Sequence, residues 1–411
     1  MANSLLTISM ITRQAVRLFR NSNAFIQNIN KQYSSEFGKD GAQIGTTLRI
    51  RLPNDFTVTD GPAFSGQNTA EQSTTLSIQY QRHVDLSFSS VDMTLSLQDF
   101  SERILEPAMN NLGGNVASTI MGISEGGVSN FVSNVDGGGA IISPTSQTVL
   151  SAGALLSKRS AQMMDRNLVV DPNTMAGVLG TMQGLFNPVA DISKQYRTAQ
   201  IYRALNFRWF EDQTVLVHTT GTFTAGTVSG ADQTGTTLVT NAITGTLNQG
   251  DIINIAGVNA VNRVTKATDG VLQQFVVTAD VSNGATSIPI YPAIIAPAST
   301  GPSAGAAVQY QTCAAAPANA AAISLVNTAG ETYRKNIAYV PQAVTMATAD
   351  LWLPPSGQGQ SSRAVFDGIS MRMIKDYYLP GTDQAVTRID TLFGALWVRP
   401  EWACVVADSV A

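Results

Sequence analysis

The stretch between residues 219 and 312 constrains the fold of this chain most, because it is almost free of charge. Its only charged residues are Asp232, Asp251, Arg263, Lys266, Asp269 and Asp280. Short runs of alternating apolar and polar residues recur in it, as at 251–255 and 286–290, and turn signals such as Asn283-Gly284 separate them. Such alternation is typical of half-buried strands. We expect a small all-β domain, a barrel or a sandwich, inserted into a larger fold, entered near Thr219 and left near Pro317.

Charge is sparse in the whole chain as well. The 411 residues include 25 Lys and Arg and 29 Asp and Glu, which together make 13%, whereas soluble proteins carry about 25%. Two interpretations fit: a β-rich protein with polar uncharged loops, or a subunit that covers much of its surface with copies of itself. The net charge of −4 argues against a general affinity for nucleic acid. The hydrophobic content of 44% excludes a mostly disordered chain.

Cysteine and histidine are too rare for several kinds of site. Cys313 and Cys404 allow one disulfide at most and exclude a Cys-based zinc finger. His83 and His218 are too few for a His-rich metal centre. An uninterrupted apolar run of about 18 residues is also lacking, so we expect no membrane span. The sequence therefore predicts no metal site, no cofactor and no membrane partner.

The N-terminal segment is basic, with seven basic and two acidic residues in positions 1–51. Ser4 can cap an amphipathic helix in this segment. The apolar face of that helix holds Leu5, Ile8, Ile11, Ala15 and Leu18, and the opposite face holds Arg13, Arg17 and Arg20. This pattern predicts a basic arm on an acidic protein, whose arginines face an acidic neighbour, another protein or DNA, with protein ranked first.

Residues 44–90 are predicted to form a long extended loop. Leu48, Ile50 and Leu52 alternate with Arg49 and Arg51, and further alternating runs follow from Leu76 to Phe88. The polar stretch between these runs, about 20 residues, is too long for a tight turn. We expect the loop to need a partner surface. Arg49 and Arg51 then either pair with carboxylates of another subunit or stay solvated.

Helical spacing follows from residue 91 to 125, and Glu106-Pro107 either breaks that helix or starts a new one. Gly113-Gly114 within it indicates a weak helix or a place where another chain packs closely. Further helices are predicted at 148–164, after Asp171-Pro172 and at 318–328. Strands are predicted at 168–170, 337–346, 369–374, 392–398 and 403–406. Basic and aromatic residues interleave from Lys194 to Trp209, which is more typical of an amphipathic segment than of base stacking.

One motif raises the possibility of catalysis. Gly122-Ile123-Ser124-Glu125-Gly126 matches the nucleophile-elbow pattern, and His218 is the one downstream histidine. That elbow needs a strand before the serine and a helix after it, whereas here a helix precedes it and a Gly-rich loop follows. We therefore expect Ser124 to end a helix and expect no enzyme. A serine hydrolase remains a hypothesis that replacement of Ser124 can test.

Several strings resemble one known family. They are Gly45-Thr46-Thr47-Leu48-Arg49-Ile50-Arg51-Leu52-Pro53, Val217-His218-Thr219-Thr220-Gly221, Phe366-Asp367-Gly368-Ile369-Ser370-Met371-Arg372 with Asp376-Tyr377-Tyr378, Arg388-Ile389-Asp390-Thr391-Leu392-Phe393-Gly394, and Arg399-Pro400-Glu401-Trp402-Ala403. In order and spacing they resemble the coat proteins of short-tailed bacteriophages of the Salmonella type, over nearly the whole chain. This resemblance implies an α+β fold, the Hong Kong 97-like bacteriophage capsid fold with an inserted small all-β barrel domain.

The resemblance also implies a division of the chain. The expected parts are an N-terminal arm (1–43), an extended loop (44–90), the spine helix of a peripheral domain (91–125), an axial domain (126–218), the inserted β-barrel (219–317), and a return to the axial and peripheral domains (318–411).

The implied function is that of a major capsid protein, made in the cytoplasm of the bacterial host and located in the virion. Many copies, as hexamers and pentamers, would close into an icosahedral shell around packaged double-stranded DNA. A scaffolding protein and a portal are implied partners, a cement protein is a further candidate, and contact with DNA would be non-specific. No catalytic residue, cofactor or metal is implied. The candidate contact residues are Arg13, Arg17, Arg20, Arg49 and Arg51. The alternative is a secreted or virion-surface β-rich adhesin or tail component, which fits the barrel composition but not the basic arm and long helix.

Overall fold

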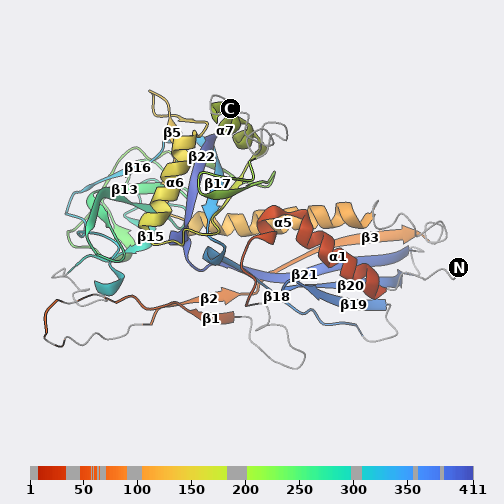
Figure 1. Ribbon diagram of the computed structural model, residues 1–411. Helices are drawn as coiled ribbons and strands as arrows, with labels where there is room; N and C mark the ends of the chain where they lie inside the picture. Colours follow the sequence, from red (N-terminus) through yellow and green to blue (C-terminus); the bar gives the residue numbers. More distant parts are fainter. Residues whose placement is uncertain are drawn as a thin grey trace. The chain divides into compact units, whose positions relative to one another are not determined.

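The computed structural model describes residues 8–33, 47–56, 58, 60–62, 64, 71–89, 104–182, 201–297, 308–354, 360–379 and 384–410. The chain divides into two compact units, whose elements Figure 1 labels. The first unit comprises Met1–Ile50, Thr74–Ile120 and Val344–Val398. The second comprises Arg51–Ser73, Met121–Ala343 and Arg399–Ala411.

A five-stranded antiparallel sheet forms the centre of the first unit. Its strands are β3 (Tyr80–Ser89), β18 (Val344–Ala349), β19 (Gln360–Phe366), β20 (Ile369–Leu379) and β21 (Gln384–Trp397). β21 pairs with β3 along one edge and with β20 and then β18 along the other. Ile389 and Phe393 of β21 are fully buried, as are Ile369 and Met373 of β20. The strands predicted at 369–374 and 392–398 are confirmed, and both are longer than the sequence indicated.

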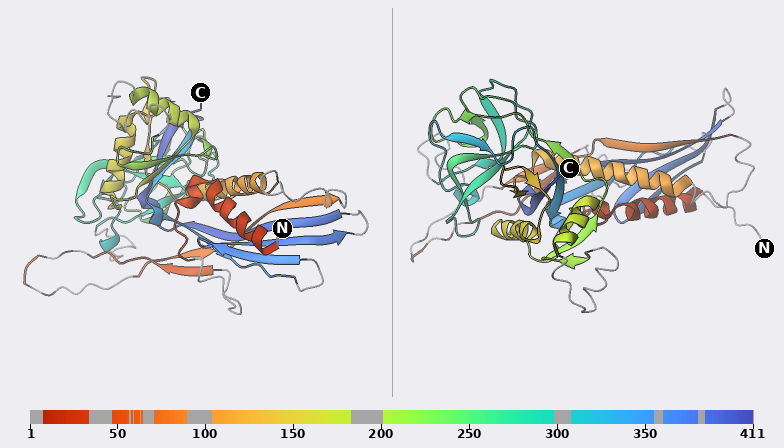
Figure 2. Two further views of the ribbon diagram at one scale, coloured as in Figure 1. Left: turned by 45° about the vertical axis from the view of Figure 1, so that its right-hand side comes forward. Right: turned by 90° about the horizontal axis from the view of Figure 1, so that it is seen from above.

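Helices α1 (Ile8–Ser22) and α5 (Glu106–Ile123) cover one face of this sheet (Figures 1 and 2). The predicted N-terminal helix is confirmed, with Ile11 and Ala15 on its buried face. That face continues through Val16 and Phe19, while Leu18 is only half-buried. The expected cap at Ser4 lies outside the described residues. Val16 and Phe19 are buried because α1 packs on β19 and β20.

The structure gives a reason for Gly113, one of the three glycines in helix α5. It begins at Glu106 and places Pro107 in its first turn, where the missing N–H does no harm. A Cβ on Gly113 would lie 2.1 Å from Ser22 Oγ, at the end of α1. Gly113 therefore marks a close approach, and the helix that approaches is α1 of the same chain. The helical pattern predicted for residues 91–103 lies outside the described part.

Two strands form the base of the predicted loop. β1 (Thr47–Arg51) pairs with β2 (Ser73–Ser77), and the Leu52 amide donates to the Gln72 carbonyl at 2.9 Å. Ile50 and Leu76 are buried against Ala347. The run at Val84–Phe88 is not part of this pair, since it lies in β3 of the five-stranded sheet. The base of the loop is thus two-stranded, as its alternating sequence predicted.

The second unit contains a seven-stranded sheet in the order β4 (Phe131–Val132), β22 (Ala403–Ser409), β17 (Thr332–Tyr339), β7 (Asn167–Val170), β9 (Phe207–Glu211) and β8 (Arg203–Ala204), with β10 (Val217–Thr219) paired to β17. Helices α6 (Ser146–Lys158) and α7 (Pro172–Met182) pack on one face. A small hairpin, β5 (Asn134–Val135) with β6 (Ile141–Ile142), precedes α6. The two cysteines, Cys313 and Cys404, are both buried and unbridged.

The helix starts of this unit follow their capping residues. Thr145 accepts a hydrogen bond from the Thr148 amide, and Asp171 accepts one from the Asn173 amide at 2.9 Å. The helix predicted after Asp171-Pro172 is confirmed as α7. Phe207 and Trp209, from the interleaved basic and aromatic segment, are buried in the core between α6, α7 and the sheet. These two rings are therefore structural, as the amphipathic interpretation expected.

The low-charge stretch and the segment that follows it, up to Leu325, form a six-stranded antiparallel sheet in the second unit. Its order is β11 (Gly226–Thr227), β16 (Ala322–Leu325), β13 (Ile252–Val261), β14 (Thr268–Val277), β15 (Ser287–Ile294) and β12 (Gly235–Val239). A bridge between Val228 and Thr240 connects the two ends of this order. Phe275, Val277, Ile253 and Ile290 are among the apolar side chains that its core buries.

The helix predicted at 318–328 is wrong, because this segment contains β16. Alanines favour a helix by propensity, but Ile323 is buried in the core of the six-stranded sheet while Ala322 and Ser324 are exposed. This alternation with a period of two lets Ser324 and Leu325 pair with β13. Tertiary pairing overrides local propensity here.

Candidate functional site

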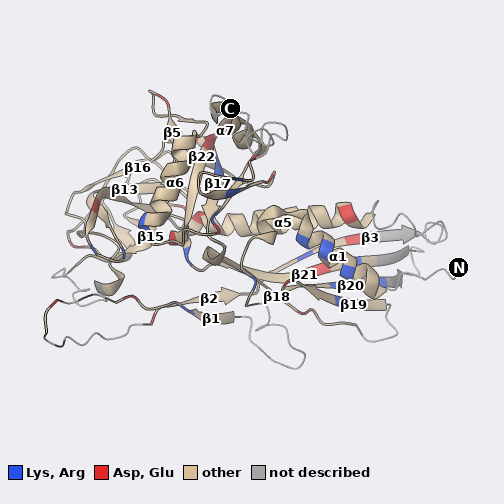
Figure 3. Ribbon diagram, in the orientation of Figure 1, with Lys and Arg blue, Asp and Glu red and all other residues tan. Residues whose placement is uncertain are grey.

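The three predicted arm arginines lie together on α1. Figure 3 shows basic residues along this helix, and its sequence contains no acidic residue. Arg13 and Arg17 are exposed, and the Arg17 guanidinium lies 5.7 Å from the centre of the Phe366 ring. Arg20 Nε donates to Asp367 Oδ2 at 3.0 Å. The helix therefore presents positive charge on the side opposite to its buried residues.

Asp367 is shared by two cations, because Lys31 Nζ also donates to its Oδ2 at 3.0 Å. Burial acts to raise the pKa of Asp367, but its hydrogen bonds to Lys31 and Arg20 outweigh burial and lower that pKa. One carboxylate thus faces two positive groups at this end of α1, and the local charge stays positive.

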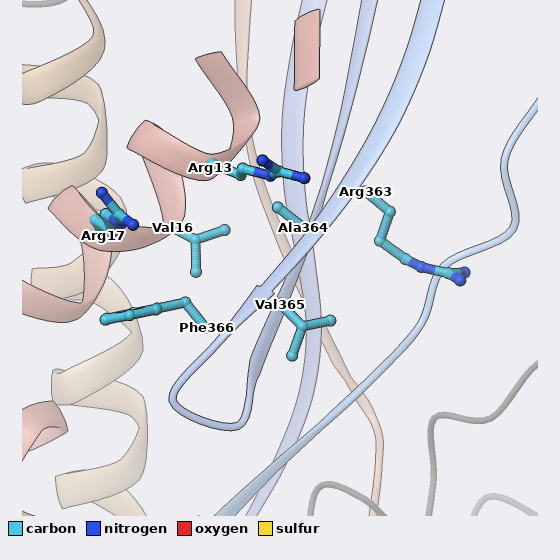
Figure 4. Close-up of a pocket in the computed structure, with 7 residues that line it drawn as sticks. All are labelled: Arg13, Val16, Arg17, Arg363, Ala364, Val365 and Phe366. Carbon is cyan, nitrogen blue, oxygen red and sulfur yellow. The ribbon is translucent and has the colours of Figure 1, made fainter. Parts of the chain in front are cut away.

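A groove of about 420 Å³ runs between α1 and the end of β19 (Figure 4). Arg13, Val16 and Arg17 line it from the helix, and residues 363–366 line it from the strand. Val365 and Phe366 remain 62% and 40% exposed. Exposed apolar groups beside exposed arginines are typical of a surface that another protein covers.

Arg49 and Arg51 lie on β1, two residues apart and therefore on one face of that strand. Both are exposed. Arg51 pairs with Glu71 at 3.4 Å, and both side chains are more than half exposed, so this ion pair adds little stability. The sequence placed the five candidate arginines correctly on a helix and on a loop strand. Their contact with another subunit stays a prediction.

Ser124 does not have the surroundings of a nucleophile. It opens a 3₁₀ turn directly after α5, and it is buried. Its Oγ has no hydrogen-bond partner in the described part of the chain. The elbow pattern is therefore the end of a helix, as expected.

His218 is held by two carboxylates and is not free to serve as a base. Its Nε2 lies 2.9 Å from Asp251 Oδ1, and its Nδ1 lies 3.4 Å from Glu125 Oε1. Because the two carboxylates lie at opposite ring nitrogens, both nitrogens are occupied. Sequence reasoning missed this cluster. Its signal was Asp251, a lone acid at the start of an apolar strand in the low-charge stretch.

Lys335 completes this cluster, with its Nζ 3.8 Å from Glu125 Oε1. Successive residues of β17 point to opposite faces, so Ala338 joins the core with α6 and α7, while Tyr333 and Lys335 lie on the other face. The Tyr333 ring packs edge-on against His218, with ring centres 5.4 Å apart. Asp251 also accepts backbone hydrogen bonds from Gly221 and Asn248, at 3.0 and 2.7 Å. The cluster joins the six-stranded and seven-stranded sheets.

The protonation of this cluster follows from its contacts. Burial acts to lower the pKa of His218, but the hydrogen bonds to Asp251 and Glu125 outweigh it and raise that pKa above 6.5. Burial lowers the pKa of Lys335 despite the attraction of Glu125 and Asp251. With His218 protonated, two cations and two carboxylates balance each other. The arrangement stabilises a junction and offers no acid and base for catalysis.

Two of the strings that carry the family resemblance, 366–372 and 388–394, meet in the first unit. Arg372 of β20 and Asp390 of β21 are cross-strand partners, and Arg372 Nε donates to Asp390 Oδ1 at 3.0 Å. Arg388 Nε and Gln81 Nε2 also contact Asp390 Oδ2, at 3.3 and 3.1 Å. Asp390 is fully buried. These motif residues therefore hold the strands of the sheet together.

The described residues contain neither a membrane-spanning helix nor a metal-binding cluster. None of the helices resolved there is long and apolar enough to cross a membrane. Within the same residues, His, Cys, Asp and Glu side chains form no group of three or more arranged to hold a metal ion.

The chain has relatives among solved structures. It resembles a structure described as "Mycobacterium phage Che8", with 12% identity, coverage of 94% of this chain and 90% of that chain, and a TM-score of 0.46. It resembles "Capsid of Ralstonia phage GP4" with 7% identity, coverage of 93% and 92%, and a TM-score of 0.45. "CUS-3 coat protein I-domain" matches 25% of this chain and 93% of that chain, with 24% identity and a TM-score of 0.20. No curated protein sequence matches the chain.

The family assignment rests on the sequence. The model of the family described as "P22 coat protein - gene protein 5" matches residues 1–406, nearly the whole chain. This match argues against the alternative of an adhesin or tail component. The expected α+β, Hong Kong 97-like fold class is confirmed. The chain therefore belongs to the P22 coat protein family, and it is a bacteriophage major capsid protein that forms the shell of the virion.

Proposed function

We propose that the shell forms through the basic face of α1 and through the long loop that follows β1. The observation that carries this proposal is the groove between α1 and β19. It combines the exposed Arg13 and Arg17 with Val365 and Phe366, which a free subunit would leave in water. An acidic segment of a neighbouring subunit, with apolar residues of its own, fits this surface. The apolar groups favour a protein partner over DNA, whose backbone binds proteins chiefly through its charged phosphates.

Reversing one charge tests this surface. In the full chain, Arg17→Glu is expected to lower the yield of shells about tenfold, because like charges brought together across an interface cost several kcal/mol. Shells are counted by electron microscopy and sedimentation. The matched control is Arg203→Glu, the same change at an exposed arginine of β8. Equal yields from both variants would remove α1 from the interface. Normal shells that fail to package DNA would assign Arg17 to the DNA instead.

The loop and its two arginines form the second part of the proposal. Phe56, Val58 and Phe64 of this loop are 60%, 93% and 97% exposed. Large apolar side chains so exposed are expected to be covered in the assembly. Arg49 and Arg51 lie at the start of the same loop, where they can pair with carboxylates of the subunit that the loop reaches. The ion pair of Arg51 with Glu71 is solvent-exposed, so exchanging it for a pair across an interface costs little.

The domain division is proposed with one change. The arm (1–43), loop (44–90), spine helix (91–125) and axial domain (126–218) keep their expected bounds. The inserted domain is proposed as a barrel that runs from 219 past 317, because β16 pairs with β13 and β11. The bridge between Val228 and Thr240 supports closure of its sheet. Residues after β16 return to the axial and peripheral domains.

Removal of the inserted domain tests its role. We expect a chain without residues 222–326 to give few shells or shells of altered size, because the domain is fastened to its surroundings by the His218 cluster. Particle size and yield by electron microscopy measure this. Shells of normal size and yield would reduce the domain to an outward decoration.

The remaining partners are proposed from the family. They are a scaffolding protein during assembly, a portal at one vertex, non-specific contact with packaged double-stranded DNA, and a cement protein. The proposed icosahedral shell consists of hexamers and pentamers of this chain. We also propose a structural role without catalysis, which the burial of Ser124 and the doubly bonded His218 support. An esterase assay that separates the wild-type chain from Ser124→Ala would overturn this part.

A further inference from the structure

Arg263 connects three separate parts of the second unit. It lies in the turn between β13 and β14, inside the low-charge stretch. Its Nε donates to Asp55 Oδ2 at 2.7 Å, and its Nη1 donates to Glu401 Oε1 at 2.9 Å. Asp55 belongs to the loop after β1, and Glu401 belongs to the 3₁₀ turn Pro400–Trp402 before β22. One guanidinium therefore fastens the loop to the body of the unit.

The turn that carries Arg263 is held by hydrogen bonds of its own. The Asn262 side chain accepts hydrogen bonds from the amides of Val264 and Thr265, at 2.9 and 3.1 Å, which fixes the turn. The side chains of Arg263, Asp55 and Glu401 are 29%, 24% and 28% exposed. Partly buried pairs with direct hydrogen bonds are stronger than the solvent-exposed pairs of this chain. The fork of arginine suits two carboxylates at once.

A second contact lies beside the first. Tyr310, which is 8% exposed, donates its hydroxyl hydrogen to Asn54 Oδ1 at 3.1 Å. Asn54 and Asp55 are half-buried, whereas Phe56, Val58 and Phe64 are exposed. Arg263 and Tyr310 thus contact the loop at two adjacent residues, and the described loop residues after them are exposed to solvent. The direction in which the loop leaves the second unit depends on these two contacts.

We infer that Arg263 is a positioning residue for assembly: by holding Asp55 against Glu401 it aims the long loop at the neighbouring subunit. This inference rests on the proposed contact between that loop and a neighbour. The physical reason is entropic, since a loop whose base is fixed loses less conformational freedom when it docks. It also gives the six-stranded region a task in assembly, the orientation of a loop that lies far from it in sequence.

The test uses the full chain before assembly. Chymotrypsin cleaves after Phe56, which directly follows Asp55, and the rate of cleavage at this bond reports how often Asp55 leaves its native position. We expect Arg263→Ala to raise this rate about tenfold, which corresponds to about 1.4 kcal/mol. Asp55→Ala should have the same effect, and the double variant should be no faster than either single one, because both remove the same interaction between Arg263 and Asp55. Arg263→Lys should give an intermediate rate.

The matched control is Arg208→Ala, which removes an exposed ion pair with Asp165 in the same unit. It should leave cleavage of the loop unchanged. Shell yield is measured in parallel, and it should fall for Arg263→Ala while the thermal unfolding temperature stays close to that of the wild type.

Three results are decisive. Unchanged cleavage in Arg263→Ala overturns the inference. Faster cleavage together with a normal yield of shells also overturns it, because shell formation would then not depend on the orientation of the loop. If the wild type and Arg208→Ala form no shells either, the proposed function fails, and the cleavage rates still decide whether Arg263 holds the loop.

Discussion

The Asp390→Ala variant is expected to lose about 3–5 kcal/mol of stability in the first unit, because it leaves buried cations without their partner. Asp390 is fully buried and receives hydrogen bonds from Arg372, Arg388 and Gln81. Arg372 is only 12% exposed, so water cannot replace the lost carboxylate. Amide hydrogen exchange of β20 and β21, measured with and without urea, gives the local free energy of opening.

The control for this prediction is Asp85→Ala on the neighbouring β3. Asp85 is 48% exposed and lies 3.8 Å from the same Arg388, so its removal should cost less than about 1 kcal/mol. A second variant, Arg372→Met with Asp390→Leu, should recover part of the loss, since apolar groups of similar size often replace a buried pair. Equal losses for Asp390→Ala and Asp85→Ala would contradict the assignment of Asp390 as the centre of the sheet.

The second unit is expected to lose stability as the pH rises above about 6.5. The folded pKa of His218 is raised above its ordinary value of 6.5. A group with a raised folded pKa binds its proton more tightly in the folded state. Its stabilisation is therefore complete below about pH 6.5 and is lost as the pH rises through the folded pKa. Urea unfolding at about pH 6 and about pH 8.5, followed by hydrogen exchange of β10 and β17, measures the change.

The His218→Gln variant isolates this effect. It should be less stable than the wild type at the lower pH and should show a flatter dependence on pH. Glu125 does not interfere, because its pKa is lowered from 4.5 and it stays charged throughout this window. Burial lowers the pKa of Lys335, so loss of the Lys335 proton makes the unit more stable as the pH rises, opposite to the effect of His218. The contribution of His218 is therefore the difference in pH dependence between the wild type and His218→Gln. An identical dependence on pH in both would falsify the role of His218.

The resemblance of short strings anticipated the fold because those strings are structural. Arg372 and Asp390 lie in two different strings and form the central ion pair of one sheet. Alternation in 251–255 and 286–290 anticipated strands because one face of each is buried. The Ala-rich segment that became β16 was misread, since only its pairing with β13 selects a strand there.

The candidate site was only partly predictable. The arginines of α1 were found because the helical period separates charged from apolar positions within one element. The grip of Arg263 on Asp55 and Glu401, and the His218 cluster, were not found. Arg263 lies 208 residues from Asp55 and 138 residues from Glu401, and the members of the His218 cluster come from separate strands and turns. Sequence spacing carries no information about such pairs.

The few charged residues of the insertion include two that form ion pairs with residues outside it. Two of its few charged residues, Asp251 and Arg263, hold the six-stranded region to the rest of the unit. In a stretch almost without charge, each remaining ion costs desolvation and is retained where a partner compensates it. Isolated charges in a stretch that is otherwise almost uncharged are therefore a useful signal for junctions between parts of a chain.

The sequence by itself determined the family, the strands of the insertion and the basic face of the arm helix, because periodicity and short motifs are local properties. Only the tertiary structure decided what Gly113, His218, Asp390 and Arg263 do. Each acts through a partner brought near by folding: Ser22 at a helix crossing, two carboxylates at a junction, an arginine across a sheet, and a loop aspartate. Contacts of this kind depend on distances in space, and a linear pattern does not encode them.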